Sequence, residues 1–540
     1  AVLALTRHRP SCERPLASHG QAVRKRLPWQ QAKHNISVAM TAEEAPFARA
    51  EQAKNEGNEL FKKNNYVKAI VAYTIAIQFS EDGADDDGLD TLDGMKEKNP
   101  NIQVYYANRA FCHLKMESYG SALSDATKAI QAKPDFPKGY YRRGSAYLAL
   151  GRPKDALRDF TQLCKLAPSD KDAREKFKAC QKQVQQEKFA LAIASDKTKP
   201  MSETVVLGNM DVDSQYDGPV YESGKVTPEF CEQLMEWQRQ EKIVAKKYAY
   251  AIVLDMIQLL KNLTTLVDID VPEDKEFTVC GDVHGQYYDL LNIWKINGLP
   301  SEDNPYLFNG DFVDRGSFSS EVILILFAWK LCYPQHMNLS RGNHETRNMN
   351  KLYGFEGEVT KKFDEDLYTL FCEAFCLLPL CHVINKKVFV VHGGLFSTDN
   401  VTLDSVRKVN RDCEPPDEGL MTEMLWSDPQ GGKGRTPSKR GVGVAFGEDV
   451  TDNFLKTNDL KLVIRSHEMK EEGYEVEHSG KLITVFSAPN YCDQMGNKGA
   501  FIRFNGKTLE PKMTSFAAVP HPNVRPMQYA NPMLGSMFGM

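Results

Sequence analysis

Small residues recur in a fixed register along the first third of the chain. Three copies of the pattern begin at Gly57, Ala110 and Gly144, and each has an alanine twelve residues further on. The second and third copies also have a proline 24 residues after their start. Small side chains at this spacing let paired helices approach closely, and proline ends the second helix of each pair. We therefore expect paired helices over residues 47–190, with residues 171–190 as a terminal capping helix.

The distance between the copies indicates the type of repeat. From the second copy to the third it is 34 residues, the period of tetratricopeptide (TPR) repeats. From the first copy to the second it is 53 residues, so the first repeat carries an insertion, which we place at about 80–101. This segment has eight acidic residues and two lysines. We interpret it as a solvated loop, and a regulatory or partner-binding segment is the alternative.

The pattern changes after residue 190. Residues 191–226 lose the periodicity and gather Ser, Asp, Gly and Pro, which is typical of a linker between domains. From 227 to 520, helical stretches alternate with short apolar runs, which predicts an α/β domain. Five of these runs read as strands that end in a polar motif: Phe277–Cys280, Tyr306–Phe308, Met337–Ser340, Val388–Val391 and Leu462–Ile464.

The polar motifs after these strands are rich in Asp, Asn and His. They are Gly281–Gly285, Asn309–Gly316, Arg341–Glu345, His392–Gly394 and Arg465–Glu468. Side chains at several strand ends can converge on one crevice, and this mixture without thiolate suits Mn, Fe or Zn better than Ca or Mg. Two such metals about 3.5–4 Å apart can clamp an in-line attack on phosphorus. Arg341 and Glu345 are interpreted as a structural ion pair.

Composition and charge narrow the class of protein. The chain has 540 residues, with 67 Lys and Arg against 72 Asp and Glu, so the formal net charge is −5. This balance argues against a general nucleic-acid binder. No apolar run reaches about 18 residues, so we expect no membrane span. The twelve cysteines include no Cys-x-x-Cys pair, which favours a reducing compartment over a disulfide scaffold or a zinc ribbon.

The first 46 residues form a basic leader that we expect to be disordered. Its first 39 residues include five Arg and two Lys but only one Glu. An organelle transit peptide has such a composition. Met40, which precedes Thr-Ala-Glu-Glu, is a plausible true start instead. We expect a cytoplasmic and nuclear protein, with organelle targeting by the leader as the alternative.

Several motifs together resemble known families. Gly-Asp-x-His-Gly, Gly-Asp-x-x-Asp-Arg-Gly and Gly-Asn-His-Glu resemble the metallophosphoesterase signature, and Ser487–Cys492 points to the phosphoprotein phosphatase branch. Joined to three TPRs, the chain resembles the type-5 serine/threonine protein phosphatase family, and Pro520–Met527 is similar to that family's tail. The resemblance implies an α-helical TPR domain, then an α/β metallophosphoesterase domain with a central β-sandwich flanked by helices. Residues 521–540 would be a regulatory tail.

The resemblance also implies roles in hydrolysing phosphoserine and phosphothreonine in proteins. Asp282, His284 and Asp311 would bind one metal ion. Asp311, Asn343, His392 and His467 would bind the second, and a hydroxide held between the metals would attack phosphorus. The remaining roles follow from the same motifs: His344 as the acid for the leaving oxygen, Asp314 as its partner, Arg315, Asn343 and Arg440 for phosphate, and Tyr491 and Asn490 lining the site. Without the resemblance, Arg440 reads as part of a solvated loop.

Basic and amide side chains of the TPRs form a second candidate site. Two pairs four residues apart share a helix face, Lys54 with Asn58 and Lys138 with Arg142. Solvated helix faces are the alternative. In the family, such residues bind the Met-Glu-Glu-Val-Asp end of the 90-kDa heat-shock chaperone, and the resemblance extends this partner to the chain. The candidate set is completed by Asn108 and Lys115.

The resemblance implies regulation as well. In the family the TPR domain covers the catalytic cleft, and Glu117 is the candidate to cover Arg315. Deleting residues 1–225 is then expected to raise basal activity several-fold. We expect a monomer. Two other functions stay open at this stage: a chaperone adaptor with a structural phosphatase fold, and a phosphodiesterase or nucleotidase on the same metal scaffold.

Overall fold

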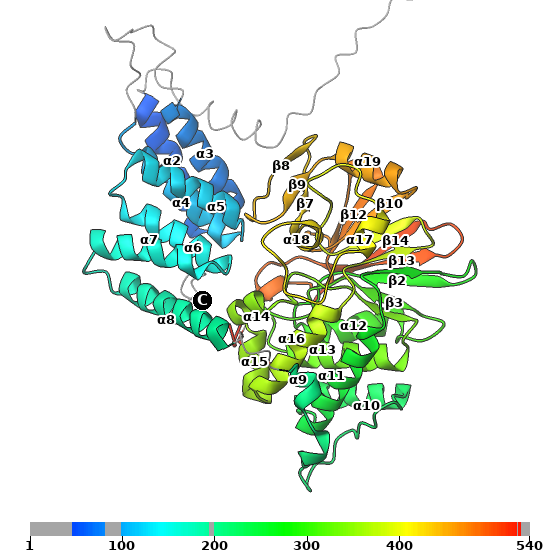
Figure 1. Ribbon diagram of the computed structural model, residues 1–540. Coiled ribbons are helices and arrows are strands. Elements are labelled where there is room, and N and C mark those ends of the chain that lie inside the picture. Colours follow the sequence, from blue (N-terminus) through cyan, green and yellow to red (C-terminus); the bar gives the residue numbers. More distant parts are fainter. Residues whose placement is uncertain (1–45, 82–98, 194–198, 526, 531–540) are drawn as a thin grey trace, which may run out of the picture. The chain divides into compact units, whose positions relative to one another are not determined.

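The computed structural model describes residues 46–81, 99–193, 199–525 and 527–530 (Figure 1). Residues 1–45 of the basic leader, most of the acidic insertion and the last ten residues lie outside them. The chain divides into two compact units, residues 1–100 and 101–540. Within the described ranges, none of the helices combines the length and the apolar character that crossing a membrane requires.

The described part of the first unit is a helix pair. Helix α2 (Pro46–Lys62) packs against α3 (Tyr66–Glu81). Gly57 lies so close to the ring of Tyr73 that an added Cβ would come within 2.7 Å of it, and Ala69 is fully buried. The small residues of the first copy therefore stand where the two helices touch, as the repeat pattern predicts.

Five further helices open the second unit, each packed on the next. Ala110, Ala122 and Ala156 are fully buried between them, and Gly144 lies against the ring of Phe160. The expected helical repeats are confirmed. Their bounds are α4 (Ile102–Lys115), α5 (Tyr119–Ala132), α6 (Pro137–Ala149), α7 (Pro153–Leu166) and α8 (Lys171–Ile193).

The segment read as a linker is docked on the helices that follow it. Its residues 191–193 end helix α8, and in its described residues 199–226 the short helices are α9 (Met201–Thr204) and η1 (Leu207–Asn209). The backbone N–H of Met201 donates to Glu373 Oε1 at 2.6 Å. Tyr221 is buried in the main apolar cluster and donates its hydroxyl to Asp255 at 2.8 Å. Tyr221 thus belongs to the core of the α/β region, and Met201 packs against that core.

Two mixed β-sheets stack face to face at the centre of the α/β region. Side chains from both, among them Val279, Val390, Ile464 and Ile502, share one apolar cluster. This confirms the expected sandwich. The first sheet has the order β1 (Leu266–Ile269), β5 (Cys381–Ile384), β6 (Val388–Val391), β10 (Leu462–Arg465), β12 (Leu482–Val485) and β11 (Tyr474–Glu477). The second has the order β14 (Pro511–Phe516), β13 (Gly499–Asn505), β2 (Glu276–Cys280), β3 (Tyr306–Phe308) and β4 (Met337–Leu339).

Helices cover the outer face of each sheet. One cluster joins Phe308 of the second sheet to helices α10 (Pro228–Arg239), α11 (Lys246–Lys261), α12 (Tyr287–Asn297), α13 (Ser319–Cys332), α15 (Phe355–Lys362) and α16 (Glu365–Leu377), with α14 (Arg347–Tyr353) packed on α15. The first sheet packs on α17 (Leu403–Arg407), α18 (Leu420–Trp426) and α19 (Glu448–Thr457). A small third sheet is built from β7 (Asp428–Pro429), β9 (Val444–Phe446) and β8 (Arg435–Pro437).

The strand directions bring the polar motifs together. Strands β2, β3 and β4 run parallel to one another, and so do β6, β10 and β12. The carboxyl ends of parallel strands lie at one edge of a sheet. The Asp, Asn and His side chains that follow β2, β3, β4, β6 and β10 therefore emerge on the same side of the sandwich.

Candidate active site

The predicted metal ligands stand in tight loops directly after their strands. His284, Asp311 and His467 have positive φ angles of 48°, 51° and 70°. Residues other than glycine rarely adopt this conformation, and such strain clusters at functional sites because the surrounding structure enforces it. All six predicted ligands are buried.

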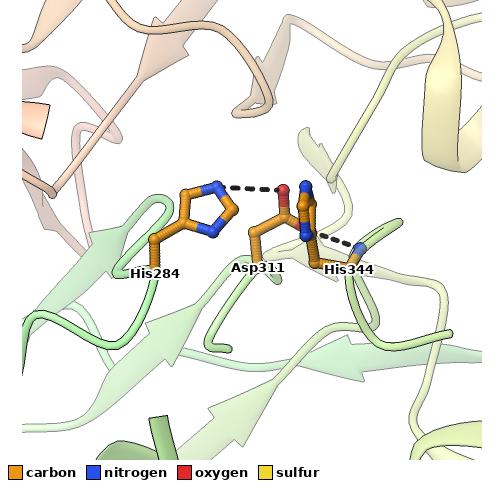
Figure 2. A group of neighbouring side chains, drawn as sticks. All are labelled: His284, Asp311 and His344. Carbon is orange, nitrogen blue, oxygen red and sulfur yellow. Dashed lines mark hydrogen bonds and ion pairs between the residues drawn. The ribbon is translucent and has the colours of Figure 1, made fainter. Parts of the chain in front are cut away.

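Two groups of ligand atoms share the Asp311 carboxylate. One contains His284, Asp311 and His344, and the other contains Asp311, His392 and His467. Asp311 Oδ2 lies 3.5 Å from His284 Nε2 and 3.3 Å from His392 Nε2. Figure 2 shows Asp311 between the rings of His284 and His344. One carboxylate shared by two groups is what a pair of neighbouring metal ions requires.

The hydrogen bonds of the histidine rings fit a bound cation. His284 Nδ1 lies 3.0 Å from the Val313 carbonyl, and His392 Nδ1 lies 2.8 Å from the Asn309 carbonyl. Because a carbonyl only accepts, each Nδ1 carries the proton and each Nε2 turns a lone pair toward Asp311. Metal-binding histidines are commonly held in this way. His467 Nε2 is buried and has no hydrogen-bond partner within the described ranges.

Burial sets the charge states in this cluster. It lowers the pKa of the His284, His392 and His467 rings, which favours the neutral form that binds metals. Burial also raises the pKa of Asp282, with the Asp311 charge as a further cause, to about 7. Burial is also the main cause that raises the pKa of Asp311 to about 8. Bound cations would offset this cost of burying carboxylates.

His344 differs from the other histidines because a carboxylate already holds it. Its Nδ1 lies 2.8 Å from Asp314 Oδ2, while Asp314 also accepts from Asn350 Nδ2 and the Phe355 N–H. The His344 backbone N–H donates to Asp311 Oδ1 at 2.9 Å (Figure 2). Burial and the Arg315 charge keep the pKa of His344 well below its usual value. The carboxylate therefore orients the ring but does not by itself keep it protonated.

Both predicted phosphate-binding arginines face one cavity of about 240 Å³. The Arg315 guanidinium lies 3.7 Å from the centre of the Tyr353 ring. Arg440 donates from Nε to Asp428 Oδ2 at 2.6 Å and from Nη2 to the His467 carbonyl at 2.8 Å. The other residues predicted for metal binding and catalysis that line the cavity are Asp282, His284, Asp311, Asn343, His344, His467 and Tyr491.

Comparison with known proteins identifies the chain's relatives. The calcineurin-like phosphoesterase family matches residues 275–471, the tetratricopeptide repeat matches 137–170, and the PPP5 TPR repeat region matches 177–268. Serine/threonine-protein phosphatase 5 of Homo sapiens is 51% identical over 487 residues, which are 90% of this chain and 94% of that protein. Its namesake in Arabidopsis thaliana is 52% identical over 548 residues, covering 91% and 98%.

The chain belongs to the serine/threonine-protein phosphatase 5 family. A solved protein serine/threonine phosphatase from Saccharomyces cerevisiae, described as similar to human phosphatase PP5, agrees. It is 41% identical, covers 56% of this chain and all of its own, and has a TM-score of 0.55. The predicted family, fold class and enzyme class, a protein serine/threonine phosphatase, are confirmed.

Glu345 does not form the ion pair with Arg341 that the sequence analysis predicts. Its carboxylate accepts the backbone N–H groups of Asp311, Phe312 and Gly342, each at 2.8 Å. Arg341 Nε instead donates to the Glu345 backbone carbonyl at 3.0 Å. The predicted ion pair is wrong, because the loops after β3 and β4 leave three buried N–H groups that need an acceptor.

The turn between α4 and α5 contributes to the cavity as well. Glu117, at the tip of this turn, accepts from Arg315 Nη2 at 2.5 Å, and Tyr119 shares a hydrogen bond of 2.7 Å with Tyr353. Ser121 N–H donates to the Lys439 carbonyl at 3.0 Å. Lys115 to Tyr119 all line the cavity. The acid expected to cover Arg315 therefore contacts it.

The six residues predicted to bind the chaperone are spread over both units. In the first unit, Lys54 pairs with Glu51, and Asn58 accepts from the Tyr73 hydroxyl at 2.8 Å. In the second unit, Arg142 stacks on Phe111 at 3.5 Å. Lys115 lies 5.4 Å from the same ring, Asn108 is half-buried on α4, and Lys138 is exposed on α6.

Sequence reasoning misplaced one residue and missed others. Asn490 does not line the cavity. It has a φ of 42°, and its Oδ1 accepts from the Gly496 N–H, because the chain turns back on itself there. Asp428 and Tyr353, which hold the two arginines, went unnoticed. Asp428 stands in Trp-Ser-Asp-Pro, and nothing in that stretch distinguishes it from a strand-end turn.

Proposed function

We propose that the chain hydrolyses phosphoserine and phosphothreonine in proteins with two metal ions, of Mn, Fe or Zn, bound at the strand ends. The first site would consist of Asp282, His284 and Asp311. The second would consist of Asp311, Asn343, His392 and His467. The observation that carries this proposal is the Asp311 carboxylate, whose Oδ2 lies 3.5 Å from His284 Nε2 and 3.3 Å from His392 Nε2 while the Nδ1 of each ring is bonded to a backbone carbonyl.

The side chains around the metals would bind the phosphate and protonate the leaving group. Bound metals would polarise the phosphoryl group and lower the pKa of water. Arg315 and Arg440 would hold phosphate oxygens, since a guanidinium matches phosphate geometry. His344 would give a proton from Nε2 to the departing serine or threonine oxygen, because Asp314 occupies Nδ1. Arrival of the phosphate dianion beside His344 would raise the pKa that burial and Arg315 now lower.

The α4–α5 turn would inhibit this activity. Glu117 occupies Arg315, and the same turn provides five residues of the cavity lining. A phosphate needs the guanidinium that Glu117 now binds, so substrate and Glu117 would compete. The Glu117 side chain is 30% exposed and that of Arg315 only 4%, so a phosphate that replaced Glu117 would have to balance the same buried charge.

The TPRs would bind an acidic chaperone tail. Lys115 and Arg142 lie beside the same Phe111 ring. Burial, and then the Arg142 charge, lower the pKa of Lys115. A peptide carboxylate placed between these cations would relieve their repulsion. Titration calorimetry with a peptide ending in Met-Glu-Glu-Val-Asp should give weaker binding for Arg142→Ala and unchanged binding for Arg158→Ala, whose exposed side chain pairs with Asp155.

We further propose a cytoplasmic and nuclear monomer. The eleven cysteines of the described ranges are free thiols, which suits a reducing compartment. Fluorescence microscopy of the tagged chain and light scattering would test the two statements separately.

The catalytic proposal is tested with matched substrates. Metal-loaded protein should hydrolyse a phosphoserine peptide and leave a phosphodiester or a nucleotide nearly untouched. Removal of metal by a chelator should abolish the activity, and Mn²⁺ should restore it. Metal content, measured by elemental analysis, should be two ions per chain and should fall for Asp311→Asn. Preference for the diester or nucleotide would favour the alternative hydrolase, and inactivity with two metals bound would contradict the proposal.

A further inference from the structure

We propose that Asp428 is a positioning residue that holds Arg440 in the orientation in which it binds the substrate phosphate. The inference rests on the proposed function. Asp428 lies in β7 of the small third sheet, and Arg440 lies in the loop between β8 and β9 of the same sheet. Arg440 Nε and Nη2 lie 2.6 Å and 3.2 Å from the two carboxylate oxygens of Asp428. A planar guanidinium group that is hydrogen-bonded to a carboxylate through two nitrogen atoms has a fixed orientation.

The loop that carries Arg440 needs such a support. Gly441 and Gly443 have positive φ angles of 84° and 67°, so the loop bends sharply on the far side of Arg440. A long arginine side chain on such a loop loses conformational entropy when it is fixed. Nε and Nη2 are used by Asp428 and by the His467 carbonyl, which leaves Nη1 for a phosphate oxygen. The carboxylate fixes the side chain before substrate arrives.

Asp428 also bonds a second arginine, which defines the competing explanation. Arg465 Nη2 donates to Asp428 Oδ1 at 2.9 Å, and Arg465 Nε donates to the Gly393 carbonyl at 2.6 Å. Gly393 and Arg465 stand next to the loops of His392 and His467. If Asp428 acted mainly through Arg465, its loss would disturb metal binding. If it acts through Arg440, its loss would weaken phosphate binding while the metals remain.

The burial of Asp428 makes its charge important. Only 2% of the residue is exposed, and Arg465 is fully buried. Two guanidinium groups this close would repel each other without an anion between them, and burying an unpaired charge is expensive. Asn at this position keeps the shape and one acceptor oxygen, but its amide N–H₂ would face a guanidinium that can only donate. Asp428→Asn therefore removes the two-point contact with Arg440 at the smallest change in packing.

The experiment compares Asp428→Asn, Arg440→Ala and the double variant with the wild type. The wild type must hydrolyse a phosphoserine peptide and be inhibited by inorganic phosphate. For Asp428→Asn we expect KM and the phosphate inhibition constant to rise about tenfold, with a smaller change in kcat and two metals retained. The double variant should be no worse than Arg440→Ala alone, because the two residues act as one unit. Asp428→Glu should recover part of the phosphate affinity.

Asp399→Asn is the matched control, because Asp399 pairs with Arg435 at 2.8 Å outside the cavity. It should leave the phosphate inhibition constant unchanged. Additive losses in the double variant, or loss of metal from Asp428→Asn, would overturn the positioning role in favour of support through Arg465. Unaltered phosphate binding in Asp428→Asn would overturn it outright. A wild type that binds two metals but hydrolyses nothing would instead contradict the proposed function.

Discussion

The metal cluster and the α4–α5 turn contact the same cavity but are built differently. In and around the metal cluster, three functional groups have a buried partner: Asp314 bonds His344, Asp428 bonds Arg440, and Glu345 bonds the backbone of Asp311. The α4–α5 turn reaches the cavity through a few side-chain and backbone contacts, and the Glu117 side chain is 30% exposed. The first region is therefore held by buried partners, whereas the second acts on Arg315 through a part-exposed carboxylate.

The largest effect is expected from the leaving-group acid. His344→Asn should lower kcat on a phosphoserine peptide by about 10²–10⁴-fold, because general acid catalysis contributes that much. Two metals should remain bound, since the predicted ligand set omits His344. The loss should be smaller with an aryl phosphate whose acidic leaving group departs without being protonated. An equal loss on both substrates would contradict the acid role.

Glu345→Gln tests how far the metal cluster depends on its buried supports. The variant places an amide against three N–H groups that now share a carboxylate. We expect metal affinity to fall about 10–100-fold, as for other groups that orient metal ligands. Competition with a chelator measures this directly. Glu356→Gln, on the adjoining helix α15, is the control, and equal losses in both variants would point to general destabilisation.

Glu117→Gln tests the α4–α5 turn. Basal turnover should rise several-fold, because phosphate no longer competes with a carboxylate for Arg315. The substitution is a sharper test than deleting residues 1–225, since that deletion also removes Tyr221 from the catalytic core. Glu59→Gln, an exposed change in α2, should have no effect. Basal turnover unchanged by Glu117→Gln would remove the turn from the regulatory account.

The smallest effect concerns the C-terminal segment. Burial alone would lower the pKa of His521, but hydrogen bonds to the Pro522 carbonyl and to Asp493 raise it overall. A folded-state pKa above the unfolded one means that the contribution to stability is complete below about pH 6.5 and is lost as pH rises through the folded pKa. The melting temperature of His521→Gln should therefore fall below that of the wild type at pH 6 and match it at pH 9. A difference independent of pH would contradict this.

The sequence predicts the metal cluster far better than its supports. Strand-end motifs such as Gly281–Gly285 specify both the local turn and the ligand, so convergence of the ligands follows from parallel strands. Glu345 and Asp428 act through contacts with residues of other loops, which no spacing in the sequence reveals. Asn490 was misjudged because a left-handed turn directs it back to Gly496.

In the helical repeats, too, the sequence predicts one part of the structure and leaves another part open. Fixed spacing of small residues predicts helix pairing, because Ala and Gly are needed where the helices touch. The use of their charged faces is less predictable. Lys54 already pairs with Glu51, and Arg142 lies on Phe111. Periodicity locates a helix face, but the neighbours of each charge decide whether it is available for a ligand.

The most direct test of the account measures phosphoserine-peptide hydrolysis in Mn²⁺ by the wild type and by Glu117→Gln, each with and without a Met-Glu-Glu-Val-Asp peptide. The account predicts low basal turnover in the wild type that rises several-fold with the peptide. It predicts turnover in Glu117→Gln that is high from the start and changes little. Equal turnover in all four measurements would contradict inhibition by the α4–α5 turn, and no turnover with two metals bound would contradict the catalytic proposal.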